Sequence, residues 1–428
     1  MRNVNVEPGG VRIRKIVGML MGVEGVVVED VRVDVSREVL VVVVRARRNA
    51  RGRCPQCGAR CPKYDRGEGP RRWRALNLGS WTTYVEAEVG RVLCAKHGVR
   101  AAWVAWARPN SGFTRGFEDQ VAWLVTRTSK STVCELLGIA WRTVGAIIER
   151  TLGEAWRGRD AFAGLRRIGI DEVSYRKGHH YLTVVRDHDT GRVVWAEVGR
   201  DSKTLSRFFD LLGAERSSRI EAVSADAAPW IAKVVRERCP QAQLCIDPYH
   251  VVAWANDALD RLRRTLWNEA REKGAKVEAA AVKGDRYVVC KNPENLTGGQ
   301  KARLSAIERF NRPLYRGYLL KETMRQAIRE KGHEGVATLA RWLAWARRCR
   351  LPPFTKLAKT IGRHREGIEA ALQTGLANAG SEATNNGVRL LTRLAYGFHS
   401  PAALIALIKL KFGGVRIPLP FRYACRAR

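Results

Sequence analysis

Three acidic residues, far apart in the chain, are the ones whose surroundings could support chemistry. Asp171 follows the apolar Ile168 and Ile170 of a strand, where an acid is either a metal ligand or a cap. Asp226 ends a second strand, and Glu382 lies in the first turn of a helix, where an acid also favours the helix dipole. Carboxylates are preferred ligands of Mg²⁺, and two such ions about 3.5–4 Å apart support phosphodiester chemistry. The three acids therefore predict a two-metal site, provided that the fold brings them together.

The elements that must position the first two acids form a regular series. Apolar periodicity and turn residues predict, in order, three strands, a helix, a strand, a helix and a strand: 166–175, 180–186, 192–198, 203–212, 220–225, 227 onward and 243–247. This is the order of a ribonuclease-H-like domain, with an antiparallel meander and two further parallel strands. Such a sheet places Asp171 on its first strand beside Asp226 at the end of its fourth.

A long basic segment separates these strands from Glu382. Residues 251–378 are helical in pattern and too long for a connection within such a domain, so we interpret them as an α-helical insertion. Trp342 and Trp345 in this segment are either core residues or base-stacking platforms, and the flanking apolar residues favour core. In the following helix, Asn385 and Asn386 follow Glu382 at i+3 and i+4, and Arg389 and Arg393 continue at four-residue steps, so one face is predicted to carry acid, amide and two cations. Such a face suits a phosphate backbone and a metal.

Two short cysteine motifs predict a second metal site. Cys54 and Cys57 form one pair, Cys94 and His97 form another, and a glycine follows each pair. The two-residue gap within each pair lets both side chains reach one ion, so the four residues predict a tetrahedral structural Zn²⁺ site. The alternative is that these are buried thiols. Cys61 could compete as a ligand, although it lies outside the two-residue spacing.

The region between the zinc motifs and Asp171 has the pattern of a helix-turn-helix. Two valine-rich runs near the N-terminus, 25–33 and 39–44, first predict a β-hairpin. From residue 113 the pattern becomes helical: a helix with Phe117, Val121, Leu124 and Val125 on one face, a short helix capped by Ser131, a turn at Gly138, and a helix over 141–152. Short helices joined by a glycine turn also occur in unrelated folds. If the motif binds DNA, Arg142 and Thr143 face the major groove.

The composition limits the class of protein. The 428 residues exceed one hydrophobic core, and 76 Lys and Arg against 42 Asp and Glu give a net charge of +34, which favours a polyanionic partner. Nucleic acid is the leading candidate, and an anionic membrane is the alternative. No apolar run approaches the ~20 residues needed to span a bilayer, and no signal peptide is evident. Ten scattered cysteines do not suggest a disulfide scaffold. We therefore expect a cytoplasmic, nucleoid-associated protein without a membrane partner.

Several motifs together resemble those of the ISL-three family of insertion-sequence transposases. They are the first cysteine pair, the helix-turn-helix, the Gly-Ile-Asp-Glu-Val-Ser-Tyr stretch around Asp171, the Ser-Glu-Ala-Thr-Asn-Asn stretch around Glu382, and residues 396–398. The resemblance implies an Asp-Asp-Glu triad of Asp171, Asp226 and Glu382, which are 55 and 156 residues apart. It also implies that Asp247 and His250, the family's Asp-x-x-His signature, position DNA or order the site; a merely structural pair is the alternative.

The resemblance further implies an enzyme that binds double-stranded DNA, both transposon ends and target, and cleaves and joins it with two Mg²⁺ or Mn²⁺ ions. A homodimer or higher oligomer on DNA is expected. The second zinc pair departs from the family, which often has Cys-x-x-Cys there, so His97 is the ligand that most needs testing. Two other functions remain open: a catalytically idle DNA-binding regulator, and a ribonuclease-H-like nuclease or resolvase.

The predicted fold is therefore multidomain α/β. Its five segments are a β-rich zinc-binding region over 1–108, a helix-turn-helix over 109–160, the first part of the catalytic core over 161–250, the α-helical insertion over 251–378, and the C-terminal part of the core over 379–428.

Overall fold

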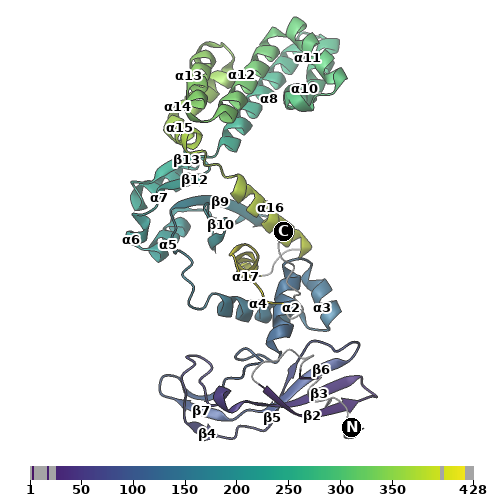
Figure 1. Ribbon diagram of the computed structural model, residues 1–428. Helices are drawn as coiled ribbons and strands as arrows, with labels where there is room; N and C mark the ends of the chain where they lie inside the picture. The colour runs from purple at the N-terminus through teal and green to yellow at the C-terminus, as the bar shows by residue number, and fades with distance from the viewer. Residues whose placement is uncertain (1, 4–16, 19–25, 396–399, 420–428) are drawn as a thin grey trace. The chain divides into compact units, whose positions relative to one another are not determined.

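The computed structural model describes residues 2–3, 17–18, 26–395 and 400–419 (Figure 1). The chain divides into two compact units: residues 1–159 together with 394–428, and residues 160–393. The family motif at 396–398 lies outside the described residues.

A five-stranded sheet forms the base of the first unit. Its order is β1-β2-β3-β6-β5, from Arg2–Asn3, Val26–Asp34, Val39–Ala46, Thr82–Glu88 and Pro70–Arg74. The β2 and β3 strands pair antiparallel, which confirms the predicted hairpin, and β3 pairs parallel with β6. Val42, Val85 and Trp73 are among the side chains that the sheet buries. A smaller sheet follows, with the order β4-β7-β8, from Lys63–Asp65, Arg91–Cys94 and Gly98–Ala101.

Three helices of the first unit occupy the predicted helix-turn-helix region: α2 (Arg115–Val125), α3 (Lys130–Leu137) and α4 (Trp141–Ala155). Gly138 ends α3 in the left-handed conformation, as the glycine turn requires. The predicted cap at Ser131 is wrong, because Ser131 lies inside α3. The cap is Ser129, whose hydroxyl accepts a hydrogen bond from the Thr132 N–H at 3.0 Å.

The sheet of the second unit has the order β11-β10-β9-β12-β13. Its strands are β9 (Arg167–Arg176), β10 (His180–Asp187), β11 (Val193–Val198), β12 (Ala222–Ala225) and β13 (Gln243–Ile246). The first three form an antiparallel meander, whereas β12 pairs parallel with both β9 and β13. The strand that carries Asp171 is therefore central, and Asp226 directly follows its parallel neighbour.

Three helices lie between the strands of this sheet in the chain: α5 (Ser202–Leu212), α6 (Ala214–Ser217) and α7 (Pro229–Arg238). Leu205 and Phe208 of α5 and Ile231 of α7 join Ile168 and Val223 of the strands in one buried cluster. This core fixes β9 against β12, the two strands that carry the acids.

From Pro248 to Thr374 the chain is mainly helical. Its α-helices are α8 (Pro248–Glu272), α9 (Lys276–Gly284), α10 (Arg286–Val289), α11 (Gly298–Phe310), α12 (Arg312–Glu330), α13 (Gly332–Arg348), α14 (Pro352–Arg363) and α15 (Arg365–Thr374) (Figure 1). Trp342 is fully buried and donates its indole N–H to the Leu320 carbonyl at 2.7 Å, and Trp345 packs partly buried against the same core. Both tryptophans are therefore core residues, as the flanking sequence indicated.

The last two helices belong to different units. Helix α16 (Ala379–Leu394) lies almost wholly in the second unit, whereas α17 (Pro401–Phe412) packs on α4 in the first. The segment 379–428, predicted as one part of the catalytic core, is therefore divided between the two units. The reason is the apolar character of α17, which buries Leu404, Leu407 and Ile408 in the first unit.

Among the described residues, no single helix is long and apolar enough to cross a membrane. The α3 and α4 pair meets the length and composition test only jointly, across a bend of 103°.

Candidate active site and zinc cluster

Asp171 lies in the middle of β9, where β10 lies on one side and β12 pairs with the residues before it. Both of its carboxylate oxygens are engaged: Oδ1 accepts the Glu172 N–H at 2.7 Å, and Oδ2 accepts the Asn385 side-chain N–H at 2.7 Å. Burial, together with the nearby Asp226 and Glu172 carboxylates, raises the pKa of Asp171 to about 7. The Asp226 carboxylate is thus close enough to disfavour the charged form of Asp171, which is an arrangement that a divalent cation relieves.

Asp226 belongs to a second, tighter group with Asp247 and His250. One ligand atom from each of the three lies within 4.8 Å of the other two. Asp247 follows β13 and is buried, which raises its pKa, and it accepts the Tyr249 N–H at the start of α8. His250 Nε2 lies 2.6 Å from Asp226 Oδ1, and this neighbour raises the histidine pKa. The structure therefore brings together the acid after β12, the acid after β13 and the first histidine of α8.

A buried chain of polar side chains joins the strands to the start of α16. Ser224 of β12 donates its hydroxyl to Asn378 Oδ1 at 2.6 Å, and His188 Nε2 lies 2.7 Å from the same serine oxygen. Asn378 donates its side-chain N–H to the Ile170 carbonyl of β9 at 3.3 Å and its backbone N–H to Asp247 Oδ1 at 3.3 Å. Asn378 therefore connects β9, β12 and the acid after β13 at the point where α16 begins.

Close packing at Gly169 completes this connection. A Cβ at Gly169 would lie 2.7 Å from Ser381 Oγ and 3.0 Å from both Asn378 Oδ1 and His188 Nε2. Any side chain at this position would therefore force these polar side chains to shift. The start of α16 is fixed on β9, two residues before Asp171.

The predicted polar face of α16 is divided in the structure. Glu382, Asn386, Arg389 and Arg393 are exposed, whereas Asn385 is buried and contacts Asp171. Of the two amides, only Asn386 therefore lies on the predicted face, because three- and four-residue steps place Asn385 beside that stripe rather than on it. Arg389 donates to Asn386 Oδ1 at 3.0 Å.

Glu382 itself has no described side-chain contact with Asp171 or Asp226. It lies one helical turn before Asn385, and side chains three residues apart on a helix have Cβ atoms about 5–6 Å apart. Because Asn385 contacts Asp171, the helix carries Glu382 near the same strand, with its carboxylate exposed.

Sequence reasoning missed the residues that hold the site together. Asn378, Ser224 and His188 were not predicted, and neither was the pairing of buried Glu172 with Arg200, whose Nε lies 2.8 Å from Oε2. Burial raises the pKa of Glu172 as it does that of Asp171. An asparagine just before a helix is a capping signal that could have identified Asn378.

In the first unit, Cys54, Cys57, Cys94 and His97 converge, with ligand atoms all within 4.8 Å of one another. His97 Nδ1 lies 3.5 Å from both Cys54 Sγ and Cys94 Sγ, and Cys57 Sγ lies 3.7 Å from Cys94 Sγ. Tetrahedral zinc with Zn–S of about 2.3 Å and Zn–N of about 2.0–2.1 Å requires S···S near ~3.8 Å and S···N near ~3.6 Å. The four residues therefore have the spacing of a zinc site.

Cys61 stays outside this group. Its thiol donates to the Ala59 carbonyl at 3.4 Å, and it is not among the four converging residues. Backbone N–H groups of Lys96 and His97 lower the pKa of Cys94 to about 7, which favours the thiolate that zinc binds. The backbone of the turn from Cys94 to His97, the second zinc knuckle, thus prepares Cys94 as a ligand.

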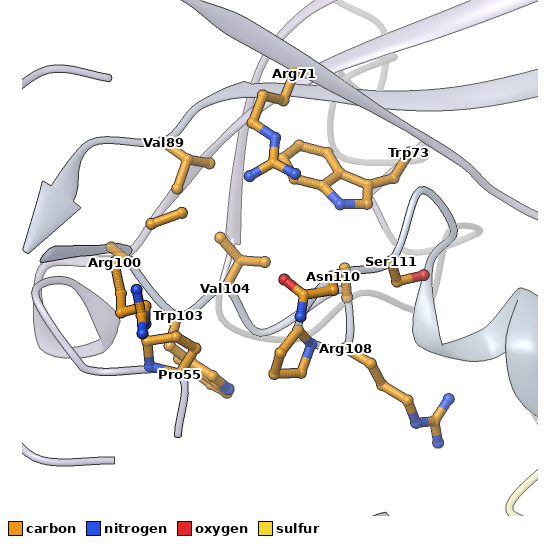
Figure 2. A pocket seen from close by; sticks show the side chains of 14 residues that line it. Pro55, Arg71, Trp73, Val89, Arg100, Trp103, Val104, Arg108, Asn110 and Ser111 are labelled. Atoms are coloured by element: carbon orange, nitrogen blue, oxygen red, sulfur yellow. The ribbon is translucent and has the colours of Figure 1, made fainter. Parts of the chain in front are cut away.

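The turn from Cys54 to Cys57, the first zinc knuckle, also forms one wall of a cavity of about 90 Å³ (Figure 2). Pro55, between the first two cysteines, lines it together with Arg71 and Trp73 of β5 and with residues 100–104. Figure 2 shows the Arg71 guanidinium beside the Trp73 ring, and the two groups are 5.4 Å apart. The segment over 102–103 is tied by its N–H groups to the Gly90 and Arg53 carbonyls, so the knuckle and the sheet share this wall.

Helices α3 and α4 cross at 103°, within the range of about 90–120° found in helix-turn-helix motifs. At the start of α4, Arg142 is exposed and Thr143 is half-buried, whereas Val144, Ile147 and Ile148 form the buried face. The residues predicted to contact DNA therefore lie on the accessible side of the second helix of the motif.

Comparison with known proteins identifies the class. A family model described as "Transposase", that of the ISL3 type, matches residues 168–408, more than half of the chain. A model of the helix-turn-helix domain of transposase family ISL3 matches residues 104–152, and one of the zinc-finger of transposase IS204/IS1001/IS1096/IS1165 matches residues 50–97. The cysteine and histidine cluster lies in the zinc-finger match, which supports structural zinc.

The chain belongs to the ISL3 family of transposases. It is 50% identical over 403 residues to the transposase for insertion sequence element IS1557 of Mycobacterium tuberculosis (strain CDC 1551 / Oshkosh), covering 90% of this chain and 91% of the relative. It is also 25% identical over 364 residues to the transposase for insertion sequence element IS1001 of Bordetella parapertussis, covering 84% and 89%. The expected family resemblance is thus confirmed, and the helix-turn-helix supports DNA binding.

Proposed function

We propose that this transposase binds the terminal inverted repeats of an insertion sequence and catalyses DNA strand cleavage and strand transfer with two divalent cations. The catalytic residues are Asp171, Asp226 and Glu382, on a ribonuclease-H-like core interrupted by the α8–α15 helices. The antiparallel meander followed by two parallel strands supports this core.

The observation that carries the proposal is the docking of α16 on β9. Asn385 donates to Asp171 Oδ2, and Asn378 bonds to the strand carbonyl just before it. A helix that begins more than 200 residues after β9 is thereby fixed beside the first acid. The turn that is fixed there carries Glu382.

The donor set fits Mg²⁺ or Mn²⁺. Asp171 and Asp226 offer hard carboxylate oxygens, and Asp226 Oδ1 is buried and accepts no hydrogen bond of normal geometry. When bound, two such ions supply an activated nucleophile and charge stabilisation on the leaving oxygen. The chain's own contribution is to hold the acids rigidly: Asn385 orients Asp171, and Asp247 and His250 order the surroundings of Asp226.

The other predicted sites support DNA and fold. Cys54, Cys57, Cys94 and His97 hold the structural zinc. Arg142 and Thr143 read DNA from α4, and Arg389 and Arg393 contact phosphates from the exposed stripe of α16. The net charge of +34 supports this extensive contact with DNA, on which the chain assembles as a homodimer or higher oligomer.

Cleavage of labelled terminal-repeat DNA by the Glu382→Gln variant tests the proposed triad. We expect cleavage with Mg²⁺ to fall by about 10²–10³-fold or more at unchanged DNA affinity, because the variant loses a charged ligand and keeps its volume. Glu334→Gln, an exposed glutamate in the first turn of α13, is the control and should retain activity. Equal activity in both variants would remove Glu382 from the triad.

A further inference from the structure

Asp226, Asp247 and His250 form a group that could bind a metal ion itself, beyond the ordering role that the family resemblance implies for Asp247 and His250. Its members come from three consecutive structural positions: the residue after β12, the residue after β13, and the third residue of α8. Parallel strands end at the same edge of a sheet, so Asp226 and Asp247 meet there, and α8 adds His250. All three ligand atoms lie within 4.8 Å of one another.

The contact between His250 and Asp226 lacks the alignment of a hydrogen bond. Nε2 lies 2.6 Å from Oδ1, yet Oδ1 is a buried atom that accepts no hydrogen bond of normal geometry. In the tautomer with its proton on Nδ1, the Nε2 lone pair points in the same direction as an Nε2 N–H would, away from Oδ1, so both atoms are free to bind a third one. A cation bound by both groups would satisfy Nε2 and Oδ1 at once.

Asp247 is arranged as an oriented ligand rather than as a free surface acid. It is 5% exposed, and its Oδ1 accepts N–H groups from both Tyr249 and Asn378, at 3.3 Å each. These bonds fix the carboxylate plane while none is described to Oδ2. Hydrogen bonds of this kind to a ligating carboxylate orient it toward a metal.

We propose that Asp226, Asp247 and His250 together bind one of the divalent cations, and that the imidazole gives this position a preference for Mn²⁺ over Mg²⁺. The inference rests on the proposed function, since Asp226 is shared with the triad. Carboxylate oxygens are suitable ligands for both Mg²⁺ and Mn²⁺. Imidazole, in contrast, is a poor ligand for Mg²⁺ and a good one for transition metals. Asp171 and Glu382 would then serve chiefly the other cation.

Electron spin-echo spectroscopy of Mn²⁺ bound to the zinc-loaded full-length protein tests this site without any DNA. A directly bound imidazole adds ¹⁴N modulation to the Mn²⁺ signal. We expect the modulation in the wild-type protein, its loss in His250→Gln, and its persistence in His333→Gln, an exposed histidine of α13. Wild-type protein that binds Mn²⁺ without this modulation, or modulation that survives in His250→Gln, would overturn the proposal.

Calorimetric titration provides the second readout. His250→Gln and Asp247→Asn should each weaken Mn²⁺ binding by about tenfold or more, and His250→Gln should change Mg²⁺ binding much less. Asp247→Asn keeps an oxygen that can accept the two N–H groups, so it tests ligation if the histidine variant does not fold. Equal losses for both metals in His250→Gln would contradict imidazole ligation.

The two proposals fail in different ways. A chain that shows imidazole-coupled Mn²⁺ but does not cleave terminal-repeat DNA retains the cation site and loses the proposed catalysis. A chain that cleaves DNA while Mn²⁺ shows no ¹⁴N coupling retains the catalysis and loses this site.

Discussion

The zinc cluster and the carboxylate site are both sets of metal-compatible side chains, but they are assembled in opposite ways. The zinc cluster takes its four residues from two turns, each of which supplies a pair three positions apart. The proposed carboxylate site would take Asp171 from β9, Asp226 from just after β12 and Glu382 from α16, more than 150 residues later. The first site is encoded locally, whereas the second depends on where one helix docks.

This difference has an energetic consequence. A small zinc-bearing region has little core of its own, so the metal contributes directly to its folding. The carboxylate site is fixed by a buried hydrogen-bond network and by the core of its sheet before any cation binds. Removing a ligand should therefore unfold the first region and leave the second folded.

The largest expected effect is that of Cys54→Ser. Structural zinc contributes about 10–16 kcal/mol of binding free energy in small zinc-binding peptides, so losing one ligand should remove the zinc and the order of the two ligand turns and the small β4-β7-β8 sheet. Zinc content per chain and proteolysis of this region measure the effect. Cys61→Ser is the matched control and should keep its zinc, since its thiol donates to the Ala59 carbonyl and is not among the four converging residues. If Cys61→Ser lost its zinc and Cys54→Ser kept it, Cys61 and not Cys54 would be the zinc ligand.

A smaller loss is expected when the docking of α16 is broken with Asn378→Ala. The substitution removes the Asn378 acceptor of the Ser224 hydroxyl and the Asn378 donor to the Ile170 carbonyl, at a cost of about 2–4 kcal/mol in the free energy of unfolding of the second unit. Denaturant titration measures it, and Asn386→Ala on the exposed side of α16 is the control. A loss below about 0.5 kcal/mol, the size of an ordinary surface substitution, would show that the network does not hold the helix.

The smallest effect is a pH dependence of stability caused by Asp171. Its pKa is raised in the folded state to about 7, against about 3.9 for an unperturbed aspartate, so the folded protein binds more protons between these values. Stability from this group is therefore greatest below about pH 4 and declines as pH rises toward 7, by at most about 1.4 kcal/mol per pH unit. Solvent screening of this partly exposed group reduces the slope.

Unfolding free energies of zinc-loaded, magnesium-free protein measured from pH 5 to 7 check this decline. The Asp171→Asn variant should show a flatter profile than the wild-type protein. Profiles of identical slope would mean that Asp171 titrates normally in the folded state.

What the sequence allowed us to predict follows the same division between local and distant contacts. The zinc knuckles, the helix-turn-helix and the strands carrying Asp171 and Asp226 were predicted because their signals lie within a few residues of one another. The network around Asn378 was not, because its partners Ser224 and Ile170 lie 154 and 208 residues away in sequence. The periodicity of apolar residues in the sequence carries no information about such long-range contacts.

Helix α16 shows where pattern reasoning fails even locally. Four-residue steps suggested one polar face, but Asn385 is buried against Asp171 while Glu382 and Asn386 remain exposed. Which side of a polar helix is buried depends on the surface that it meets, and here that surface is a strand carrying an acid. The destination of α17 could not be predicted for the same reason, since its apolar surface fits any core.

The central claim is that Asp171 is a catalytic metal ligand and not a structural acid. Its most direct test is the Asp171→Asn variant, assayed for binding and for Mg²⁺- or Mn²⁺-dependent cleavage of terminal-repeat DNA, with Asp210→Asn at an exposed position of α5 as control. We predict unchanged DNA affinity and a cleavage rate about 10²–10³-fold or more below wild type. Cleavage at the wild-type rate in Asp171→Asn would contradict the triad and the function proposed from it.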